Sequence, residues 1–163
     1  MSKTWNVLFL CTGNSARSVM SEGILNHLGK GRFQAYSAGS HPSGKVRPEA
    51  LKQLEDSGIA TEGFRSKSWD EFSGPDAPKM DFIFTVCDNA AHEVCPVWPG
   101  HPATAHWGVA DPAAVEGTPE EIARAFQEAF VILERRIRLL LALPVAELER
   151  MDLEQKLRAI GKS

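Results

Sequence analysis

Residues 11–18 read Cys-Thr-Gly-Asn-Ser-Ala-Arg-Ser and carry the strongest chemical signal in the chain. They lie between an apolar, strand-like run at 7–10 and a helix-like run at 19–28. A loop in that position wraps a tetrahedral oxyanion, because its backbone N–H groups and the N-terminus of the following helix point at the anion. Arginine grips two of the oxygens, and the same positive field favours the thiolate form of a cysteine beneath the anion.

Each residue of this loop has a predicted role. Cys11 is the nucleophile, Arg17 is the oxyanion clamp, and Ser18 donates a hydrogen bond to the thiolate. Gly13 lets the backbone turn its N–H groups inward, and Asn14 holds the loop open through side-chain hydrogen bonds. The alternative is a buried cysteine and a surface arginine that share a spacing by chance, and the flanking elements argue against it. The predicted oxyanion-binding set is Thr12, Gly13, Asn14, Ser15, Ala16, Arg17 and Ser18.

A second candidate is Asp111, which Pro112 follows. An aspartate in a loop near a thiolate nucleophile can act as a general acid and protonate a departing oxygen. By itself the Asp-Pro pair indicates only a turn. Its weight comes from its combination with the cysteine-arginine loop.

The chain has two further cysteines, Cys87 and Cys95, which are eight positions apart, unlike the C-x-x-C of a zinc knuckle. His92 lies between them and could in principle be a third metal ligand. Two buried cysteines acting as small hydrophobic residues are the plain alternative. We favour a relay of three thiols that includes Cys11, with no metal.

The rest of the pattern predicts the elements that position these residues. Apolar or β-branched runs predict strands, and four-residue apolar spacing with caps and stops predicts helices. Strands that alternate with helices predict one α/β domain with a four-stranded parallel sheet flanked by helices and a phosphate-binding loop after the first strand. Cys11 and Cys87 each follow a strand, so both belong at the carboxyl edge of the sheet. The predicted strands are 6–10, 33–38, 81–86 and 104–107, and the predicted helices are 19–28, 48–57, 89–94 and 119–143.

Some details of this organisation are less constrained. The catalytic domain is predicted to span 1–144, followed by a helical extension over 145–163. That extension could pack on the domain or mediate a self-contact, and a surface tail helix is the favoured interpretation. Trp107 could line the active site or pack in the core. The cluster Arg135, Arg136 and Arg138 is predicted to form the solvated face of the long helix.

Bulk properties exclude several classes of function. The 163 residues, 43% hydrophobic and 24% charged, suit one globular domain. A net charge of −3 gives no indication of a nucleic-acid or membrane surface. With no apolar run of about 20 residues and no signal-peptide core, the chain is expected in the cytoplasm. Thiols stay reduced there, so the 3 cysteines are expected to be reactive rather than structural.

The cysteine-arginine loop, Ser37-Ala38-Gly39 and Asp111-Pro112 together resemble the low-molecular-weight protein tyrosine phosphatase superfamily. Cys87 and Cys95 make the chain similar to the thioredoxin-coupled arsenate reductases of that superfamily. The resemblance extends from residue 6 to about residue 143.

This resemblance implies a reaction order. Arsenate binds where phosphate would, Cys11 attacks arsenic, and water leaves with a proton from Asp111. Cys87 then attacks Cys11 and releases arsenite, and Cys95 attacks Cys87 to give a disulfide that thioredoxin reduces. Glutathione with glutaredoxin is a possible alternative reductant, phosphate and sulfate are expected competitors, and no resident cofactor or metal is implied.

The chain departs from the family pattern within the site. Ala16 stands where a second loop cysteine is common, which leaves Cys11 as the sole thiol of the loop. Ala113 and Ala114 follow Asp111-Pro112 where the phosphatases carry aromatic residues, which argues against an aryl phosphate substrate.

A further departure concerns a cation slot. Some relatives bind potassium beneath the loop through residues equivalent to Asn14, Glu22 and Ser37. Where those relatives add an acidic ligand, this chain carries Lys67. We expect the Lys67 ammonium to fill that slot.

Two other functions stay open at this point. A phosphatase for phosphotyrosine or a small phosphomonoester needs only Cys11, Arg17 and Asp111. A redox-sensing or oxyanion-binding module needs no catalysis, but it leaves Asp111 and Cys95 without a purpose. The reductase interpretation uses all of these residues.

Overall fold

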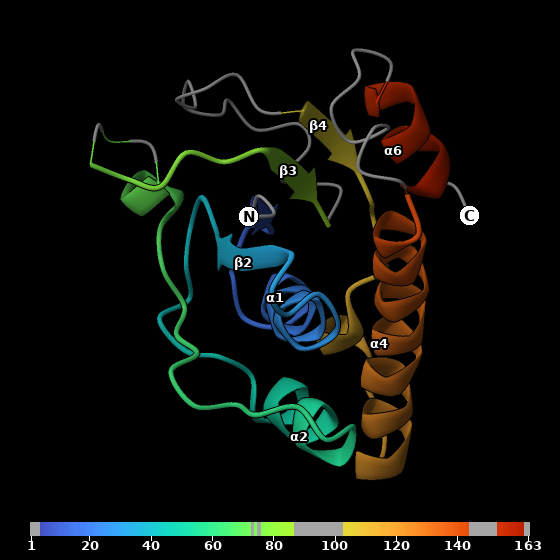
Figure 1. Ribbon diagram of the computed structural model, residues 1–163. Helices are drawn as coiled ribbons and strands as arrows, with labels where there is room; N and C mark the ends of the chain where they lie inside the picture. Colours follow the sequence, from blue (N-terminus) through green and yellow to red (C-terminus); the bar gives the residue numbers. More distant parts are fainter. Residues whose placement is uncertain (1–3, 73, 75, 87–102, 144–152, 162–163) are drawn as a thin grey trace.

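The computed structural model describes residues 4–72, 74, 76–86, 103–143 and 153–161. Four strands form one parallel sheet in the order β2-β1-β3-β4, as Figure 1 shows. The predicted fold class is therefore confirmed. The strands are β1 (Trp5–Leu10), β2 (Phe33–Ala38), β3 (Phe82–Thr85) and β4 (Ala103–His106).

The register aligns the carboxyl ends of the strands. Leu10 of β1 lies opposite Ala38 of β2 and Thr85 of β3, and Thr85 lies opposite His106 of β4. The connections that follow these four residues therefore leave the sheet at the same edge. In a parallel sheet this edge is where ligands bind.

In the described part of the chain, four α-helices flank the sheet. Residues of β1 that point to one face, such as Val7 and Phe9, are buried against helical side chains, whereas Leu8 and Leu10 pack with Phe72 and its neighbours on the other face. Both faces are thus covered, which a parallel sheet requires. The elements are α1 (Arg17–Leu28), α2 (Pro48–Asp56), α4 (Pro119–Leu141) and α6 (Leu153–Gly161), with the short 3-10 helices η1 (Trp69–Phe72) and η2 (Pro112–Ala114).

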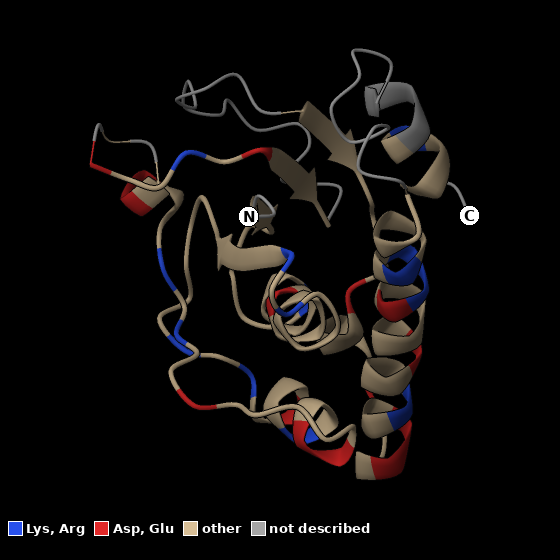
Figure 2. Ribbon diagram, viewed as in Figure 1, with Lys and Arg blue, Asp and Glu red and all other residues tan. Residues whose placement is uncertain are grey.

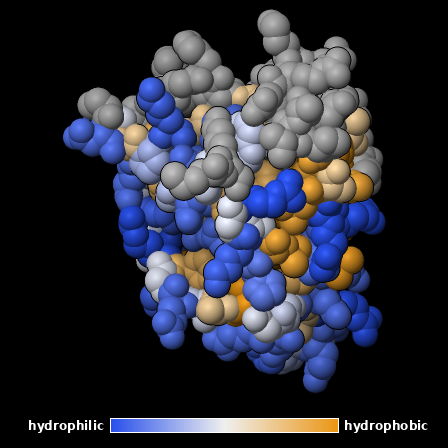
Figure 3. Space-filling view, viewed as in Figure 1, coloured by the Kyte–Doolittle hydropathy of each residue, from blue (hydrophilic) through white to orange (hydrophobic). Residues whose placement is uncertain are grey.

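The long helix α4 begins as its sequence predicts. The Thr118 hydroxyl accepts a hydrogen bond from the Glu121 N–H at 3.2 Å, and Pro119 occupies the first turn. Its apolar stripe is buried against α1, α2 and α6, and hydrophobic residues gather where α1 and α4 meet (Figure 3). The buried residues of that stripe include Phe126, Phe130, Leu133, Ile137 and Leu140.

One basic residue of α4 does not lie where we predicted. Arg136 is only 8% exposed, so its assignment to the solvated face is wrong. It follows Leu133 by three positions and precedes Leu140 by four, which is the spacing of one helix face. Arg135 and Arg138, which are rotated away from that face, are exposed.

The last helix packs on the domain, which is one of the alternatives considered for the extension. Leu157 of α6 is fully buried, and its carbonyl accepts a hydrogen bond from the Trp107 indole at 2.8 Å. Trp107 is itself a core residue, because it has no exposed surface and its ring stacks on Phe84 at 3.9 Å.

Other predictions fall outside the described residues. These are the short helix at 89–94, Cys87, Cys95, His92 and the domain boundary at 144/145. In the part of the chain that the structure describes, no helix has the length and apolar character needed to cross a membrane.

Candidate active site

Cys11 follows β1 directly, and the loop from Cys11 enters α1 at Arg17. The thiol residue is buried, with 4% of its surface exposed. Its backbone N–H donates to the Ala38 carbonyl at 3.2 Å, which extends the pairing of β1 with β2 by one position. The nucleophile predicted from the sequence therefore lies at the carboxyl edge of the sheet. We call residues 11–18 the oxyanion loop.

The carbonyl groups of the oxyanion loop are held from outside by the segment 40–47. Because these carbonyls are hydrogen-bonded outside the loop, the N–H groups are left to line its interior. An anion requires such a lining of hydrogen-bond donors. Sequence reasoning missed this segment, because a backbone N–H leaves no trace in residue type. The bonds run from His41 N to Thr12 O (2.9 Å), from Ser43 N to Gly13 O (3.0 Å) and from Arg47 N to Ser15 O (2.8 Å).

The connections around the loop carry charges of both signs. Figure 2 shows Lys and Arg residues spaced along the loops between β2 and α2 and between α2 and β3, with Asp and Glu residues among them. The cations are Lys45, Arg47, Arg65, Lys67 and Lys79, and the acids are Glu62, Asp70, Glu71, Asp76 and Asp81. The two sets balance in formal charge, so attraction of an anion depends on the N–H groups of the oxyanion loop and on Arg17.

Asn14 fixes the shape of the oxyanion loop. It is fully buried and has φ 44°, the only positive φ of a non-glycine residue in the described chain. Its side-chain amide donates to the Ser18 hydroxyl at 2.8 Å and accepts from the Lys67 backbone N–H at 2.8 Å. The hydroxyl hydrogen of Ser18 can then point to another acceptor, such as a thiolate.

Gly39 allows a close approach of backbone segments beneath the nucleophile. A Cβ at this position would overlap the Thr12 carbonyl and come within 2.5 Å of the Cys11 carbonyl. The Gly39 N–H donates to Lys67 O at 2.9 Å, and its carbonyl accepts from Trp69 N at 2.9 Å. The sequence placed Gly39 in the family motif but did not indicate this packing role.

Arg17 and Asp111 meet at the same edge of the sheet. The Arg17 Nη2 lies 3.7 Å from Asp111 Oδ2, and Nη1 donates to the Val109 carbonyl at 2.8 Å. Asp111 Oδ1 accepts from Ala113 N at 2.9 Å and so caps η2. The Asp111 side chain is 43% exposed, which gives it contact with solvent protons.

The four residues assigned to the cation slot also lie together. Ser37 Oγ donates to Glu22 Oε1 at 2.6 Å, and Lys67 Nζ lies 3.7 Å from the same oxygen. Lys67 reaches Asn14 through its backbone N–H, and Nζ donates to Arg65 O at 3.2 Å. Burial raises the pKa of Glu22, against the lowering effects of Ser37 and Lys67, and burial lowers the pKa of Lys67.

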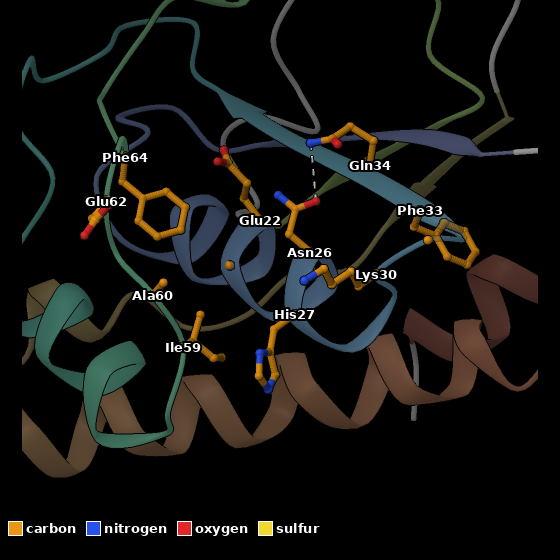
Figure 4. Close-up of a pocket in the computed structure, with 12 residues that line it drawn as sticks. Glu22, Asn26, His27, Lys30, Phe33, Gln34, Ile59, Ala60, Glu62 and Phe64 are labelled. Atoms are coloured by element: carbon orange, nitrogen blue, oxygen red, sulfur yellow. Dashed lines mark hydrogen bonds between the residues drawn. The ribbon is translucent and has the colours of Figure 1, made fainter.

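A pocket of about 430 Å³ lies beside α1 and β2, and Glu22 forms part of its wall. Figure 4 shows Phe64 and Glu62 on one side and Lys30 and Gln34 on the other. Within the described residues, no group of three or more His, Cys, Asp or Glu side chains is placed to hold a metal ion.

Comparison with known proteins identifies the class. Residues 6–155 match the family described as low molecular weight phosphotyrosine protein phosphatase, and the chain belongs to that family. The resemblance drawn from the oxyanion loop is confirmed at this level.

Within the family, the chain resembles arsenate reductases. That of Shouchella clausii is 39% identical over 121 residues, which cover 74% of this chain and 84% of the relative. That of Bacillus licheniformis is 39% identical over 140 residues, 85% of this chain and 95% of the relative. A solved structure of an arsenate reductase in the phosphate-binding state superposes with a TM-score of 0.62 at 25% identity, over 85% of this chain and 97% of that one.

Proposed function

We propose that this chain reduces arsenate to arsenite at the oxyanion loop. The observation that carries the proposal is the shared position of Cys11, Arg17 and Asp111 at one edge of the sheet. The 39% identity to arsenate reductases supports this reaction over other uses of the same loop.

Substrate binding rests on the loop and its guanidinium. Arsenate is a tetrahedral anion, and the backbone N–H groups that precede α1 are the natural donors to it. Arg17 has five N–H donors, of which only part contact Val109 and Asp111, so the others can grip the oxyanion. Phosphate and sulfate have the same shape and compete.

The first chemical step forms a sulfur–arsenic bond. The Cys11 thiolate attacks arsenic, and one arsenate oxygen leaves as water after Asp111 supplies a proton. Asp111 can regain a proton from solvent because its side chain is partly exposed. Arsenic is still As(V) in the resulting Cys11 adduct.

The second step transfers two electrons. Cys87 attacks the Cys11 sulfur, the sulfur–arsenic bond breaks, and its electron pair stays on arsenic, which leaves as As(III) arsenite. Cys95 then attacks Cys87, which frees the Cys11 thiolate and leaves a Cys87–Cys95 disulfide. Thioredoxin supplies the two electrons that reduce it, with no resident cofactor or metal, and such thiol chemistry suits the cytoplasm. Cys87 and Cys95 lie outside the described residues, so this order rests on the family resemblance.

Mass spectrometry after one equivalent of arsenate, without reductant, tests the relay. We expect one internal disulfide between Cys87 and Cys95, with Cys11 reduced. The variant Cys95→Ser should stop at a Cys11–Cys87 disulfide, and Cys87→Ser should release no arsenite.

Steady-state turnover tests the reductant. We expect NADPH oxidation with arsenate, thioredoxin and thioredoxin reductase, and loss of turnover in Cys87→Ser and Cys95→Ser. Full turnover in either variant would show that the relay is wrong. If turnover occurs only with glutathione and glutaredoxin, these are the reductant and thioredoxin is not.

A phosphomonoester phosphatase is the second candidate, because the matched family is described as a phosphatase. It requires Cys11, Arg17 and Asp111 but neither of the other cysteines. Ala113 and Ala114 offer no aromatic surface next to Asp111. A higher kcat/KM for phosphomonoesters than for arsenate would favour this candidate.

A further inference from the structure

Arg136 is a buried cation in the apolar stripe of α4. Its Nη1 donates to the carbonyls of Trp107 and Gly108, each at 3.0 Å. The ion pairs among the described residues do not include Arg136, and its Nε is buried with no hydrogen-bond partner in that part of the chain. Burial lowers the pKa of Arg136, and the nearby charge of Arg135 acts in the same direction.

This arrangement has an energetic cost. A buried charge that no carboxylate of the described residues neutralises loses its hydration and recovers it only in part through hydrogen bonds. A leucine or methionine between Leu133 and Leu140 would fill the same stripe without that cost. The two carbonyls that receive Arg136 are therefore the feature that distinguishes it from an apolar side chain.

These carbonyls begin the loop that carries the general acid. Trp107 is held on its other side, since its indole donates to Leu157 O at 2.8 Å. Two residues further, Val109 N donates to Val86 O at 3.1 Å, and Val109 O accepts from Arg17 at 2.8 Å. Asp111 follows after two more positions and stands 3.7 Å from Arg17.

We propose that Arg136 is a positioning residue that fixes the loop 107–111 and thereby places Asp111 beside Arg17. Gly108 has the greatest backbone freedom in this loop, so a bond to its carbonyl removes conformers that would turn Asp111 away. The inference rests on the proposed function in one respect, namely that Asp111 is the general acid.

Backbone hydrogen exchange tests, without reference to activity, whether Arg136 fixes the loop 107–111. We expect Arg136→Met to raise exchange about tenfold in 107–111 while β1 and α1 keep their protection. Arg136→Lys keeps a donor and should lie close to wild type. Arg138→Met is the matched control, because Arg138 is 60% exposed on the same helix, and it should change nothing. The proposal is overturned if the exchange rate in 107–111 is unchanged in Arg136→Met. It is also overturned if both Arg136 variants raise the exchange rate equally throughout the chain.

A double-mutant cycle tests the link to Asp111. Arg136→Met should lower the single-turnover rate of arsenate reduction about tenfold or more with little change in arsenate affinity, because small displacements of catalytic groups are costly. Added to Asp111→Asn, the same substitution should have almost no further effect. An equal loss in both backgrounds overturns the proposal. If the wild-type chain reduces no arsenate, the proposed function is refuted. Hydrogen exchange in 107–111 then still shows whether Arg136 fixes this loop.

Discussion

The ion pair of Lys67 with Glu22 allows a quantitative test of the cation slot. Both side chains are mostly buried, with 9% (Lys67) and 16% (Glu22) of their surfaces exposed, and Nζ lies 3.7 Å from the carboxylate oxygen. Replacement of Lys67 with methionine keeps the aliphatic stem but removes the ammonium. Glu22 then retains the hydrogen bond from Ser37 and no compensating charge within the slot.

The size of the effect follows from the distance. Two unit charges 3.7 Å apart attract by about 4 kcal/mol at an effective dielectric constant of about 20. Part of this attraction offsets the desolvation of Lys67, which the substitution removes. We expect Lys67→Met to lose about 2–3 kcal/mol of unfolding free energy at pH 8.

The pH dependence separates this cause from simple loss of packing. Burial already raises the pKa of Glu22, and loss of the Lys67 charge raises it further. A carboxyl whose pKa is higher in the folded than in the unfolded state destabilises the fold above the folded pKa. This penalty shrinks as pH falls from the folded pKa to the unfolded pKa and is absent below both. The difference between wild type and Lys67→Met should therefore be much smaller at pH 5 than at pH 8.

Urea unfolding at both pH values, followed by tryptophan fluorescence, measures these differences. Lys52→Met is the matched control, since Lys52 makes a shorter contact with Asp56 (3.1 Å) but is 73% exposed, and it should cost less than about 0.5 kcal/mol. At pH 8 the double variant Glu22→Gln/Lys67→Met should be more stable than Lys67→Met. A loss that is equal at pH 5 and pH 8 would refute the electrostatic argument. A clear rise of the wild-type melting temperature in KCl over NaCl would show that Lys67 does not occupy the slot.

Two further predictions concern the backbone of the oxyanion loop. Gly39→Ala should lower the free energy of unfolding by at least about 3 kcal/mol, because its Cβ would overlap the carbonyl of Cys11, and calorimetry should detect no phosphate binding. The control Gly74→Ala meets no atom within 4 Å and should be nearly neutral. Asn14→Ala should lose about 2–4 kcal/mol in urea unfolding, since it combines a positive φ with two lost buried hydrogen bonds. Asn14→Gly removes the strain at φ 44° but not the lost bonds, so it should be less damaging than Asn14→Ala, and the reverse order would contradict this account.

The strands and long helices could be predicted because their signals are local. The run after Pro119 repeats apolar residues at helical spacing behind a threonine cap, and the structure shows that helix from Pro119 to Leu141. The ends of the helices and strands were predicted less exactly. The helix after the oxyanion loop begins at Arg17 rather than at residue 19, because its first residues are polar and carry no apolar period.

The supports of the site could not be predicted in the same way. Ser66 Oγ bonds the Gly13 carbonyl and Lys67 N bonds Asn14, in each case across 53 positions of sequence. Contacts of that length depend on how the chain returns to the sheet edge, and no local pattern encodes them. Arg136 is different, since we predicted it on the solvated face although its spacing from Leu133 and Leu140 is that of the buried face.

The shape of the oxyanion loop is a property of the surrounding fold rather than of its eight residues. Its carbonyls are engaged by the segment 40–47, and its strained Asn14 is held by Lys67. Arg17, at the end of the loop, contacts the same segment, 107–111, that Arg136 fixes. Donors that are fixed before the substrate arrives need no reorganisation when charge develops, which is the main source of electrostatic catalysis. Substitutions in these supports should therefore weaken oxyanion binding even where Cys11 and Arg17 are intact, and a search for the cysteine-arginine motif alone would not detect such a loss.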